Sequence, residues 1–400
     1  MMIAVIGGGA AGFMAAITAK ELDSNANVTI FEKTEKVLSK VKISGGGRCN
    51  VTNATFNISQ LIKNYPRGGR KLRKSFNLFN TNHTVKWFEN RGVKLKKEAD
   101  NRMFPLSNKS QTIIDLFLNR ANKLNITISL KSKIDAINHF NNGINIIIDK
   151  KKLFFNKVII ASGGSSKLKG LDWLKQLNYN IIAPVPSLFT FNMPKNPITK
   201  LMGVSMPNVI SSIKGSNIKQ AGSLLITHWG MSGPAILKLS AFHAQELAKV
   251  NYNFTTQINW LGISEIELRK KFSKLKLNKK LVYKENYFQI PKRLWHYILT
   301  KVNISNKQIY SELSKKNINK IINTLVNDEF KVSGKTTFKE EFVTCGGIDL
   351  SEIDMLTMES KKNKNILFAG EILNIDGVTG GFNFQAAWTT GYLAGKNSVL

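Results

Sequence analysis

The sequence predicts an α/β fold in which both ends of the chain build one sheet, with antiparallel and helical parts inserted between them. Three observations predict this arrangement. An apolar stretch at residues 2–6 runs through a glycine-rich turn, GGGAAG at residues 7–12, into a run of good helix formers. Residues 342–400 repeat this pattern, with apolar stretches that end in glycine turns and a last helix rich in small residues. Residues 184–263 instead alternate apolar and polar side chains, which is typical of antiparallel strands.

The N-terminal stretch has the spacing of a βαβ unit that binds a dinucleotide. Gly7 allows a sharp turn, Gly9 lets backbone N–H groups approach a pyrophosphate, and Gly12 lets the helix pack closely on the strand. A second strand at residues 28–31 ends on Glu32, twenty residues after Gly12, where a carboxylate accepts hydrogen bonds from ribose hydroxyls. Because all these features fall at the required distances, we favour a dinucleotide site over an ordinary βαβ turn.

Residues 40–53 contain three consecutive glycines followed by Arg48 and Asn50. Such a stretch forms either a backbone cradle for an anion or a ring edge, or a flexible surface loop. We favour the cradle because the stretch directly follows the nucleotide strand.

The elements up to residue 185 follow from periodicity and from start and stop signals. The expected elements are helices between about 70 and 124, strands at 126–128, 144–148 and 153–155, a buried strand at 158–162 that ends in Gly163 and Gly164, and a helix from Trp173. Small residues at the carboxyl end of a strand let a ligand approach closely.

The remaining elements divide into an antiparallel region, a Lys-rich helical region and the C-terminal return. One helix is expected from Pro234 to about Ala248. Four are expected within residues 264–327: one with Ile266, Phe272 and Leu275 on its apolar face, one after Pro291, one capped by Ser305 and one at 318–325. The lysines of this region are explained most simply as solvated helix faces. The strand at 365–369 ends on Gly370 and Glu371, and Gly380 and Gly381 precede the last helix, whose N-terminus favours an electron-rich group.

Composition limits the class of protein. No apolar run approaches the roughly 18 residues of a membrane span, and the chain enters a strand at its first residues, so we expect a cytoplasmic protein without a membrane span. Two cysteines, Cys49 and Cys345, form no disulfide framework, which fits a reducing compartment. No metal-ligand spacing is present, and we expect no metal site.

The formal net charge of +32 and the pI of about 10.0 suggest a polyanionic partner. The excess is mostly lysine, however, scattered along the chain among many Asn and Ile residues, as codon drift in an AT-rich genome would also produce. No RNA- or DNA-binding signature accompanies the charge. A nucleic-acid partner therefore stays open as an alternative that we do not favour.

Several strings carry a resemblance to a known family. The strings are ISGGGRCNVTN at 43–53, THWGMSGP at 227–234, TMESK at 357–361, FAGE at 368–371 and GGFNFQ at 380–385. Together with the opening turn they resemble the bacterial YhiN/BaiN-type NAD(P)/FAD-dependent oxidoreductases, whose FAD domain is similar to that of glutathione reductase. The resemblance covers essentially the full length. It implies a Rossmann-like FAD-binding domain from residues 1–185 and 342–400, a β-barrel-like domain from 186–263 with 328–341, and a helical insert at 264–327.

Carried over by position, the resemblance also implies the FAD contacts. They are Gly7, Gly9, Ala10, Ala11 and Gly12 at the pyrophosphate, Glu32 and Lys33 at the adenosine ribose, backbone of Ile134 (on a strand) at the adenine, Lys40, Arg48, Cys49 and Asn50 toward the flavin, Gly370 and Glu371 toward the ribityl chain, and Gly381, Phe382 and Asn383 at the pyrimidine edge. Two departures from the family lie near the flavin cleft: Asn374 stands where Asp is common, and the loop at 165–170 is short.

The resulting functional hypothesis is an FAD-dependent oxidoreductase. It implies that NAD(P)H delivers hydride to N5 of FAD and that the hydride passes on to an unidentified small organic acceptor, such as an enone or another carbonyl-conjugated molecule. The candidates for a catalytic residue are Arg48, Cys49 and His228, although a lone histidine is more often structural and Cys49 and Cys345 lack the C-x-x-C spacing of a redox pair. The alternatives are an FAD-dependent RNA-modifying or RNA-binding protein that uses the basic surface, and a flavin-binding scaffold without turnover. The sequence indicates neither the choice between NADH and NADPH nor an oligomeric state.

Overall fold

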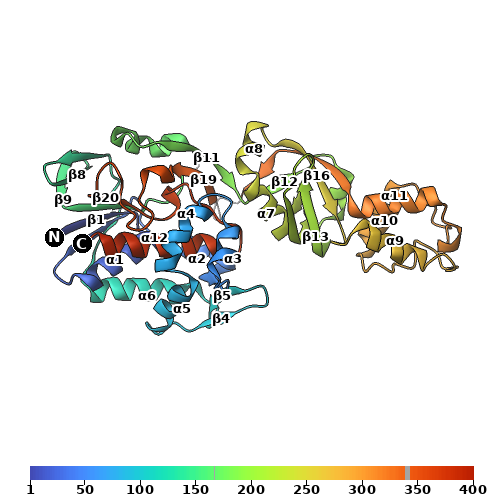
Figure 1. The fold of residues 1–400 in the computed structure, drawn as a ribbon, viewed down its shortest axis with the longest axis horizontal. Coiled ribbons are helices and arrows are strands. Elements are labelled where there is room, and N and C mark those ends of the chain that lie inside the picture. Colours follow the sequence, from blue (N-terminus) through green and yellow to red (C-terminus); the bar gives the residue numbers. More distant parts are fainter. Residues whose placement is uncertain (166, 338–342) are drawn as a thin grey trace. The chain divides into compact units, whose positions relative to one another are not determined.

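The computed structural model describes residues 1–165, 167–337 and 343–400. The chain divides into two compact units, one of residues 1–187 with 339–400 and one of residues 188–338 (Figure 1). The sequence placed these two boundaries at residues 185 and 341. Residue 166 of the loop at 165–170, and residue 342 at the start of a predicted strand, lie outside the described residues.

The central sheet of the first unit is built from both ends of the chain. Five parallel strands lie in the order β20-β10-β1-β2-β6. Their bounds are β1 (Met2–Ile6), β2 (Asn27–Phe31), β6 (Thr127–Ser129), β10 (Lys157–Ile160) and β20 (Ile366–Phe368). Strand β1 pairs with β2 on one side and with β10 on the other, so the chain changes direction across the sheet at β1. The predicted sheet from both ends is confirmed: β1 and β20 lie on either side of β10 (Figure 1).

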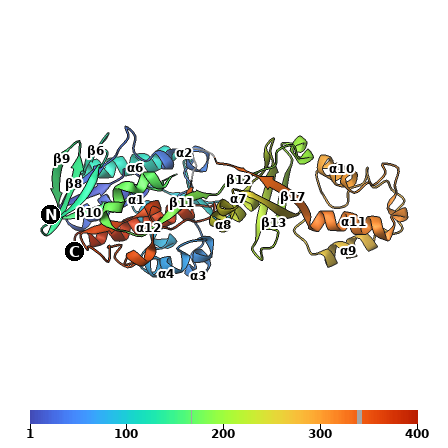
Figure 2. The ribbon, with the colours of Figure 1, turned by 90° about the horizontal axis from the view of Figure 1, so that it is seen from above.

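Two helices from opposite ends of the chain pack along each other in this unit. They are α1 (Ala10–Leu22) and α12 (Phe382–Asn397), which lie side by side in Figures 1 and 2. A Cβ atom at Gly391 would lie 2.6 Å from the Ala11 carbonyl oxygen, and one at Gly395 would lie 2.2 Å from that of Ala15. The small residues of α12 are therefore explained by this close helix contact.

Further elements surround the central sheet. The bounds are α2 (Ser39–Gly47), β3 (Thr52–Asn53), α3 (Ile58–Leu61), α4 (Gly69–Leu78), α5 (Thr81–Glu89), β4 (Leu95–Lys97), β5 (Arg102–Pro105), α6 (Ser110–Lys123), β7 (Ala136–Phe140), β8 (Gly143–Ile148), β9 (Lys151–Phe155), β11 (Ile181–Ser187) and β19 (Val343–Ile348). They form a small sheet β3-β5-β4, a meander β7-β8-β9 and an antiparallel pair β11-β19. The hairpin β8-β9 matches the sequence, whereas β3, β4, β5 and β7 were not predicted. The helix expected from Trp173 is a 3₁₀ segment, Leu168–Leu177.

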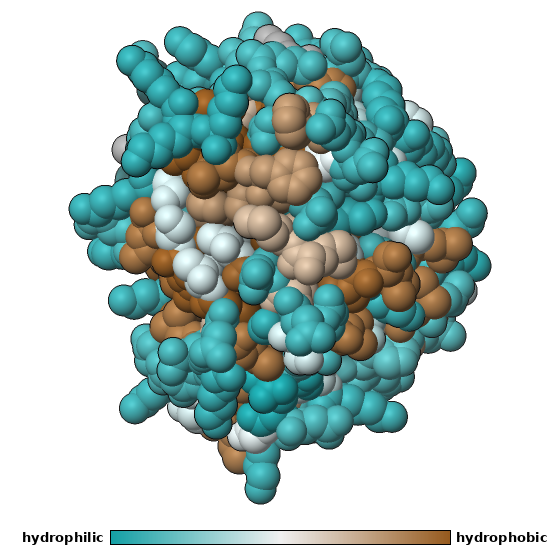
Figure 3. Space-filling model, turned by 90° about the vertical axis from the view of Figure 1, so that its left-hand side faces the viewer, coloured by the Kyte–Doolittle hydropathy of each residue, from teal (hydrophilic) through white to brown (hydrophobic). Residues whose placement is uncertain are grey.

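Apolar side chains are exposed at the end of this unit that carries both termini. Figure 3 shows them on that face among hydrophilic residues. In the meander, Phe140 and Phe154 are partly exposed and contact each other edge to face, with ring centroids 6.2 Å apart.

The second unit contains an antiparallel sheet in the order β17-β16-β13-β14-β15-β12-β18. The bounds are β12 (Thr190–Asn192), β13 (Ser205–Ile213), β14 (Lys219–Ile226), β15 (Gly230–Ser232), β16 (Asn253–Asn259), β17 (Asp328–Ser333) and β18 (Lys335–Thr336). The two outermost strands in this order, β17 and β18, are separated in the chain by Gly334 alone. One short segment therefore pairs with both ends of the strand order, so the sheet is strongly curved.

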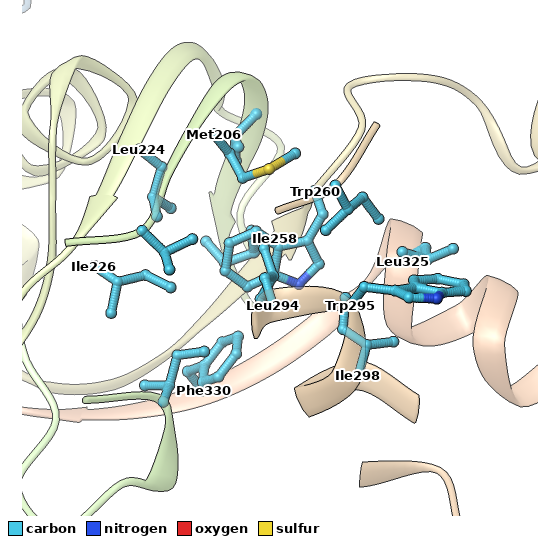
Figure 4. Packing of buried hydrophobic residues seen from close by; sticks show 14 of the residues in the cluster. Met206, Leu224, Ile226, Ile258, Trp260, Leu294, Trp295, Ile298, Leu325 and Phe330 are labelled. Carbon is cyan, nitrogen blue, oxygen red and sulfur yellow. The ribbon is translucent and has the colours of Figure 1, made fainter. Parts of the chain in front are cut away.

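Helices and sheet of the second unit share one hydrophobic core. The helices are α7 (Pro234–Phe242), α8 (Ala244–Lys249), α9 (Glu265–Ser273), α10 (Lys292–Lys301) and α11 (Lys315–Val326). Trp260, Trp295 and Phe330 belong to a single buried cluster that extends from the strands to the helices (Figure 4). The helix expected from Pro234 is divided at His243 into α7 and α8, and the stretch after Ser305 forms only a 3₁₀ turn, Tyr310–Glu312.

Within the described ranges of the chain, no helix combines the length and the apolar character that crossing a membrane requires.

Candidate cofactor site

The glycines of the turn after β1 differ in the space around them. A Cβ at Gly7 would lie 2.3 Å from the Ala161 carbonyl oxygen, and one at Gly12 would lie 2.0 Å from that of Gly7. These two glycines are required by close packing inside the protein. Gly9, the residue before α1, would meet no heavy atom within 4 Å. The open space at Gly9, beside an N-terminus of α1 that no side chain caps, fits the pyrophosphate of a dinucleotide.

Glu32, at the end of β2, is fixed against this turn. One of its carboxylate oxygens accepts a hydrogen bond from the Gly8 N–H at 2.9 Å, and the other accepts from the N–H and the hydroxyl of Thr34, both at 2.9 Å. Lys33 beside it is exposed. The carboxylate thus lies next to the expected pyrophosphate position, as ribose binding requires.

Ile134 lies in the connection between β6 and β7, and not on a strand as the sequence analysis expected. The connection leaves the edge strand beside β2, where the Ser132 N–H donates to the Glu32 carbonyl at 2.8 Å. Pairing with β8 begins directly after Ile134, where the Asp135 N–H donates to the Ile147 carbonyl at 2.8 Å. Ile134 itself is buried.

The loop after β20 brings Glu371 to the same edge of the sheet. Gly370 has φ +77°, and a Cβ there would lie 2.8 Å from the Ala11 side chain on α1. Glu371 accepts a hydrogen bond from the Thr344 N–H at 2.8 Å and forms an ion pair with Lys40 at 2.5 Å. Lys40 and Glu371, predicted from opposite ends of the chain to face the cofactor, are therefore adjacent.

The N-terminus of α12 is held by asparagines from the 43–53 stretch. With its amide oriented to satisfy both neighbours, Asn50 accepts from the Gly381 N–H at 2.9 Å and donates to the Thr52 carbonyl at 3.0 Å. Asn53 donates to the Gly380 carbonyl at 2.9 Å. The two glycine-rich stretches that the sequence analysis singled out thus contact each other.

Asn383 and Phe382 serve this turn as well. The Asn383 amide accepts from the Gly377 N–H at 2.8 Å and donates to the Gly377 carbonyl at 2.9 Å. Tyr65 donates its hydroxyl to the Phe382 carbonyl at 2.7 Å. Because its amide already makes both bonds, the Asn383 side chain fixes the turn before α12.

Arg48 and Cys49 follow the three glycines, whose φ angles are +58°, +68° and +81°. The Arg48 guanidinium lies 3.9 Å from the centre of the Phe104 ring and pairs with Glu98 at 2.6 Å. Cys49 is fully buried, and burial raises the pKa of its thiol to about 12. Burial also raises the pKa of Cys345 to about 12. Both thiols are protonated at neutral pH and are poorly suited to nucleophilic or redox chemistry.

His228 belongs to the second unit, in the turn between β14 and β15. It is exposed and contacts the ring of Trp229 edge to face, with centroids 4.4 Å apart.

One buried group in the first unit escaped the sequence analysis. Asp376, in the loop between Glu371 and Gly380, is fully buried and accepts two hydrogen bonds from Arg67 and one from the Ser187 hydroxyl at 2.8 Å. Burial raises the pKa of Asp376, and Arg67 and Ser187 oppose that effect. Arg67 and Asp376 are 309 residues apart. A local motif could not have paired them, although the aspartate in a glycine-rich loop was a signal.

The glycine turn, Glu32, Glu371 and the N-terminus of α12 all lie after carboxyl ends of parallel strands, around the point where the strand order reverses. Open α/β sheets bind nucleotides at that position. Fold and site together define the class of Rossmann-like, FAD-binding flavoproteins.

Comparisons with known proteins agree with this class. The model of the HI0933-like protein Rossmann domain matches residues 1–397, and the chain belongs to that family. The chain is 27% identical to the 3-dehydro-bile acid delta(4,6)-reductase of Clostridium scindens, with 98% of each chain covered. It is 25% identical to the ribosomal RNA dihydrouridine synthase of Escherichia coli, over 99% of this chain and 97% of the relative.

The fold also resembles a solved structure, 3-ketosteroid-delta4-(5alpha)-dehydrogenase from Rhodococcus jostii. The TM-score is 0.53 at 13% identity, with 100% of this chain and 96% of that chain covered. The protein is thus an oxidoreductase of the FAD-binding Rossmann type.

Proposed function

We propose that the protein is an FAD-dependent reductase that takes hydride from NAD(P)H and delivers it to a carbon–carbon double bond conjugated to a carbonyl. The observation that carries the proposal is the convergence of the open Gly9 turn, Glu32, the Lys40–Glu371 pair and the N-terminus of α12 at one edge of the parallel sheet. Bound FAD would supply hydride transfer, and the protein supplies binding, orientation and electrostatics.

Each part of the site has a role that its chemistry suits. The N–H groups at the start of α1 and the gap at Gly9 bind the pyrophosphate, and Glu32 accepts from the ribose. The N-terminus of α12 stabilises negative charge at the edge of the flavin. Arg48, held by Glu98 and Phe104, keeps a fixed positive charge beside the cradle of glycines. If this charge stabilises the reduced flavin, Arg48→Gln should shift the reduction potential of the flavin to more negative values.

The acceptor class follows from what two relatives are named for. A 3-oxo steroid with Δ4 and Δ6 double bonds contains an alkene conjugated to a ketone, and uridine contains a C5–C6 double bond conjugated to its C4 carbonyl. Both are reduced when hydride adds to the carbon remote from the carbonyl and a proton adds next to it. These relatives therefore support one bond type for this chain, although the molecules that carry it differ greatly in size.

The first test is the absorbance spectrum of the purified protein, followed without oxygen during addition of NADH or NADPH. We expect a flavin band that bleaches with one or both donors and recovers when an enone such as cyclohexenone is added. A band that neither nucleotide bleaches would contradict the donor and would favour a scaffold without turnover. A protein that binds no FAD after reconstitution would contradict the site itself.

The second candidate is a uridine in RNA as the acceptor. The net charge of +32 favours it, and the helical part of the second unit exposes a cluster of lysines at Lys274, Lys276 and Lys279. If these lysines contact phosphates, changing all three to Gln should make the slope of log affinity against log salt shallower by about 2. Changing Lys150, Lys151 and Lys152, which are equally exposed in the β8–β9 hairpin, is the matched control. RNA binding that is absent, or weakened equally by both triple variants, would remove this candidate.

A further inference from the structure

A cavity in the first unit is lined by residues other than those assigned to FAD. Its volume is about 560 Å³, which is within the range of small-molecule pockets. It lies between the start of α4, the 3₁₀ turn Leu350–Glu352 and the loop that follows Glu371. Its polar lining residues are Lys63, Arg67, Arg70, Lys71, Asp349 and Asn374.

The cavity carries excess positive charge. Arg67 is neutralised by its hydrogen bonds to Asp376. Lys63, Arg70 and Lys71 form no ion pair with any residue in the described part of the chain, and the carboxylate in the lining, Asp349, caps the 3₁₀ turn through the Ser351 N–H at 2.8 Å. Three cations thus face one carboxylate, and an anionic ligand would balance them.

The position of two of these cations conflicts with helix electrostatics. Arg70 and Lys71 lie in the first turn of α4, which contains no acidic residue and has no side-chain cap. The N-terminus of a helix favours negative charge, so a cation there is unfavourable. A bound anion would remove this cost, because the side chains and the exposed N–H groups would then bind the same group.

Asn374 adds a side-chain oxygen that lacks a hydrogen-bond donor. Its Oδ1 atom is buried and has no hydrogen-bond partner among the residues that the structure describes. A buried carbonyl oxygen of this kind is normally satisfied by water or by a ligand. Asn374 also lines the cavity, so a turn of its amide would present this oxygen to a ligand that carries a hydroxyl beside an anionic group.

We propose that this cavity binds the phosphate ester of a hydroxyl-bearing small molecule, at a site distinct from that of FAD. The phosphate lies at the N-terminus of α4 against Arg70 and Lys71, and a hydroxyl of the sugar donates to Asn374. Two sources share this chemistry, a nucleotide and a free sugar phosphate.

The test is calorimetric titration of the FAD-saturated protein with inorganic phosphate, ribose 5-phosphate and adenosine 5′-diphosphate. We expect ribose 5-phosphate to bind several-fold more tightly than inorganic phosphate, because only the ester supplies a sugar hydroxyl. Tighter binding of the diphosphate than of ribose 5-phosphate would identify the nucleotide as the source, and the reverse order would identify the sugar phosphate. The double variant Arg70→Gln with Lys71→Gln should weaken binding at least tenfold.

The matched control is Arg73→Gln with Lys74→Gln, which removes the same charge from exposed positions one turn further along α4. It should change the affinity less than twofold. Equal weakening by both double variants would mean a general charge effect and would overturn the proposal. So would the absence of binding at millimolar concentrations. Binding of an RNA oligonucleotide, but of none of the three small phosphates, would also overturn it.

Discussion

Gly9 and Gly12 lie in the same turn, yet a side chain would meet different surroundings at each. At Gly12 it would collide with the carbonyl of Gly7, whereas at Gly9 it would enter open space. Gly12 is therefore required by the folded protein, and we expect Gly9 to be required by a bound dinucleotide.

We expect Gly9→Val to fold normally and to lose FAD. The φ angle of Gly9 is −96°, which valine adopts without strain, and no protein atom blocks the new side chain. The FAD dissociation constant should rise at least 100-fold, or about 2.7 kcal/mol. The measurements are flavin fluorescence titration and the melting temperature of the protein without FAD. A Gly9→Val protein that purifies yellow would contradict the site.

Gly12→Ala is the contrasting variant. Its Cβ would lie 2.0 Å from a backbone oxygen, so strand and helix must separate. We expect a loss of about 3 kcal/mol or more in the free energy of unfolding. An unchanged melting temperature for Gly12→Ala would contradict the close approach of α1 to the Gly7 carbonyl.

For single residues, the sequence predicts positions that depend on neighbouring segments of the chain. The positions of Gly7, Gly9, Gly12 and Glu32 follow from spacing within one βαβ unit, because turn, helix and strand lengths fix their distances. The burial of Cys49 and the Arg67–Asp376 contact could not be predicted, since both depend on segments that only the tertiary fold brings together.

Among the elements, the close packing of α1 on α12 holds the two helix N-termini that we assign to the cofactor site. Gly391 and Gly395 let the two backbones approach, and the aromatic rings of Trp388 on α12 and Phe117 on α6 stack at 5.4 Å. If the first turn of α12 binds the flavin, as we propose, packing further along the helix positions that turn.

Gly395→Val should destabilise the first unit. A side chain there would lie 2.2 Å from the Ala15 carbonyl oxygen, and α12 must shift to accommodate it. We expect a loss of about 1–3 kcal/mol, or about 2–4 °C in melting temperature for each kcal/mol. Lys396→Val, at the exposed neighbouring position, introduces the same side chain without the collision and should shift the melting temperature much less. Equal shifts for both variants would show that helix propensity, and not close packing, is responsible.

Elements with a clear period or a local turn were predictable, and irregular ones were not. The central strands and the helix after Ser110 follow from apolar spacing. Strands β3 and β5 are too short to show a period, and β3 pairs with β5 across about 50 residues of chain. Ser305 resembles a helix cap and so predicts a helix. No sustained apolar face follows it, and the stretch forms only the 3₁₀ turn Tyr310–Glu312.

For the whole molecule, the two ends of the inserted unit are neighbours. Phe191 near its start pairs with Lys335 near its end. Its core of sheet and helix residues is complete within residues 188–338. Because its two ends are close together, we expect the second unit to fold when it is separated from the first.

We expect residues 188–337, produced alone, to unfold cooperatively in urea. Trp229, Trp260 and Trp295 report on this unit, and the three other tryptophans lie in the first unit. In the full chain, FAD should raise the midpoint of the first unit's transition and leave that of the second unchanged, because ligand binding stabilises only the part that folds to bind it. A gradual, non-cooperative loss of fluorescence from the isolated segment would contradict its independence.

The central sheet has a consequence for how the protein is made. Its middle strand, β1, is synthesised before the other strands of the sheet, whereas β20 and α12 are synthesised after all of them. At about 5–20 residues per second, the early strands wait for tens of seconds before their partners exist. A chain that stops before residue 366 lacks β20, Glu371 and the N-terminus of α12, so we expect it to bind FAD poorly. Loss of FAD would then mark chains that lack these last elements.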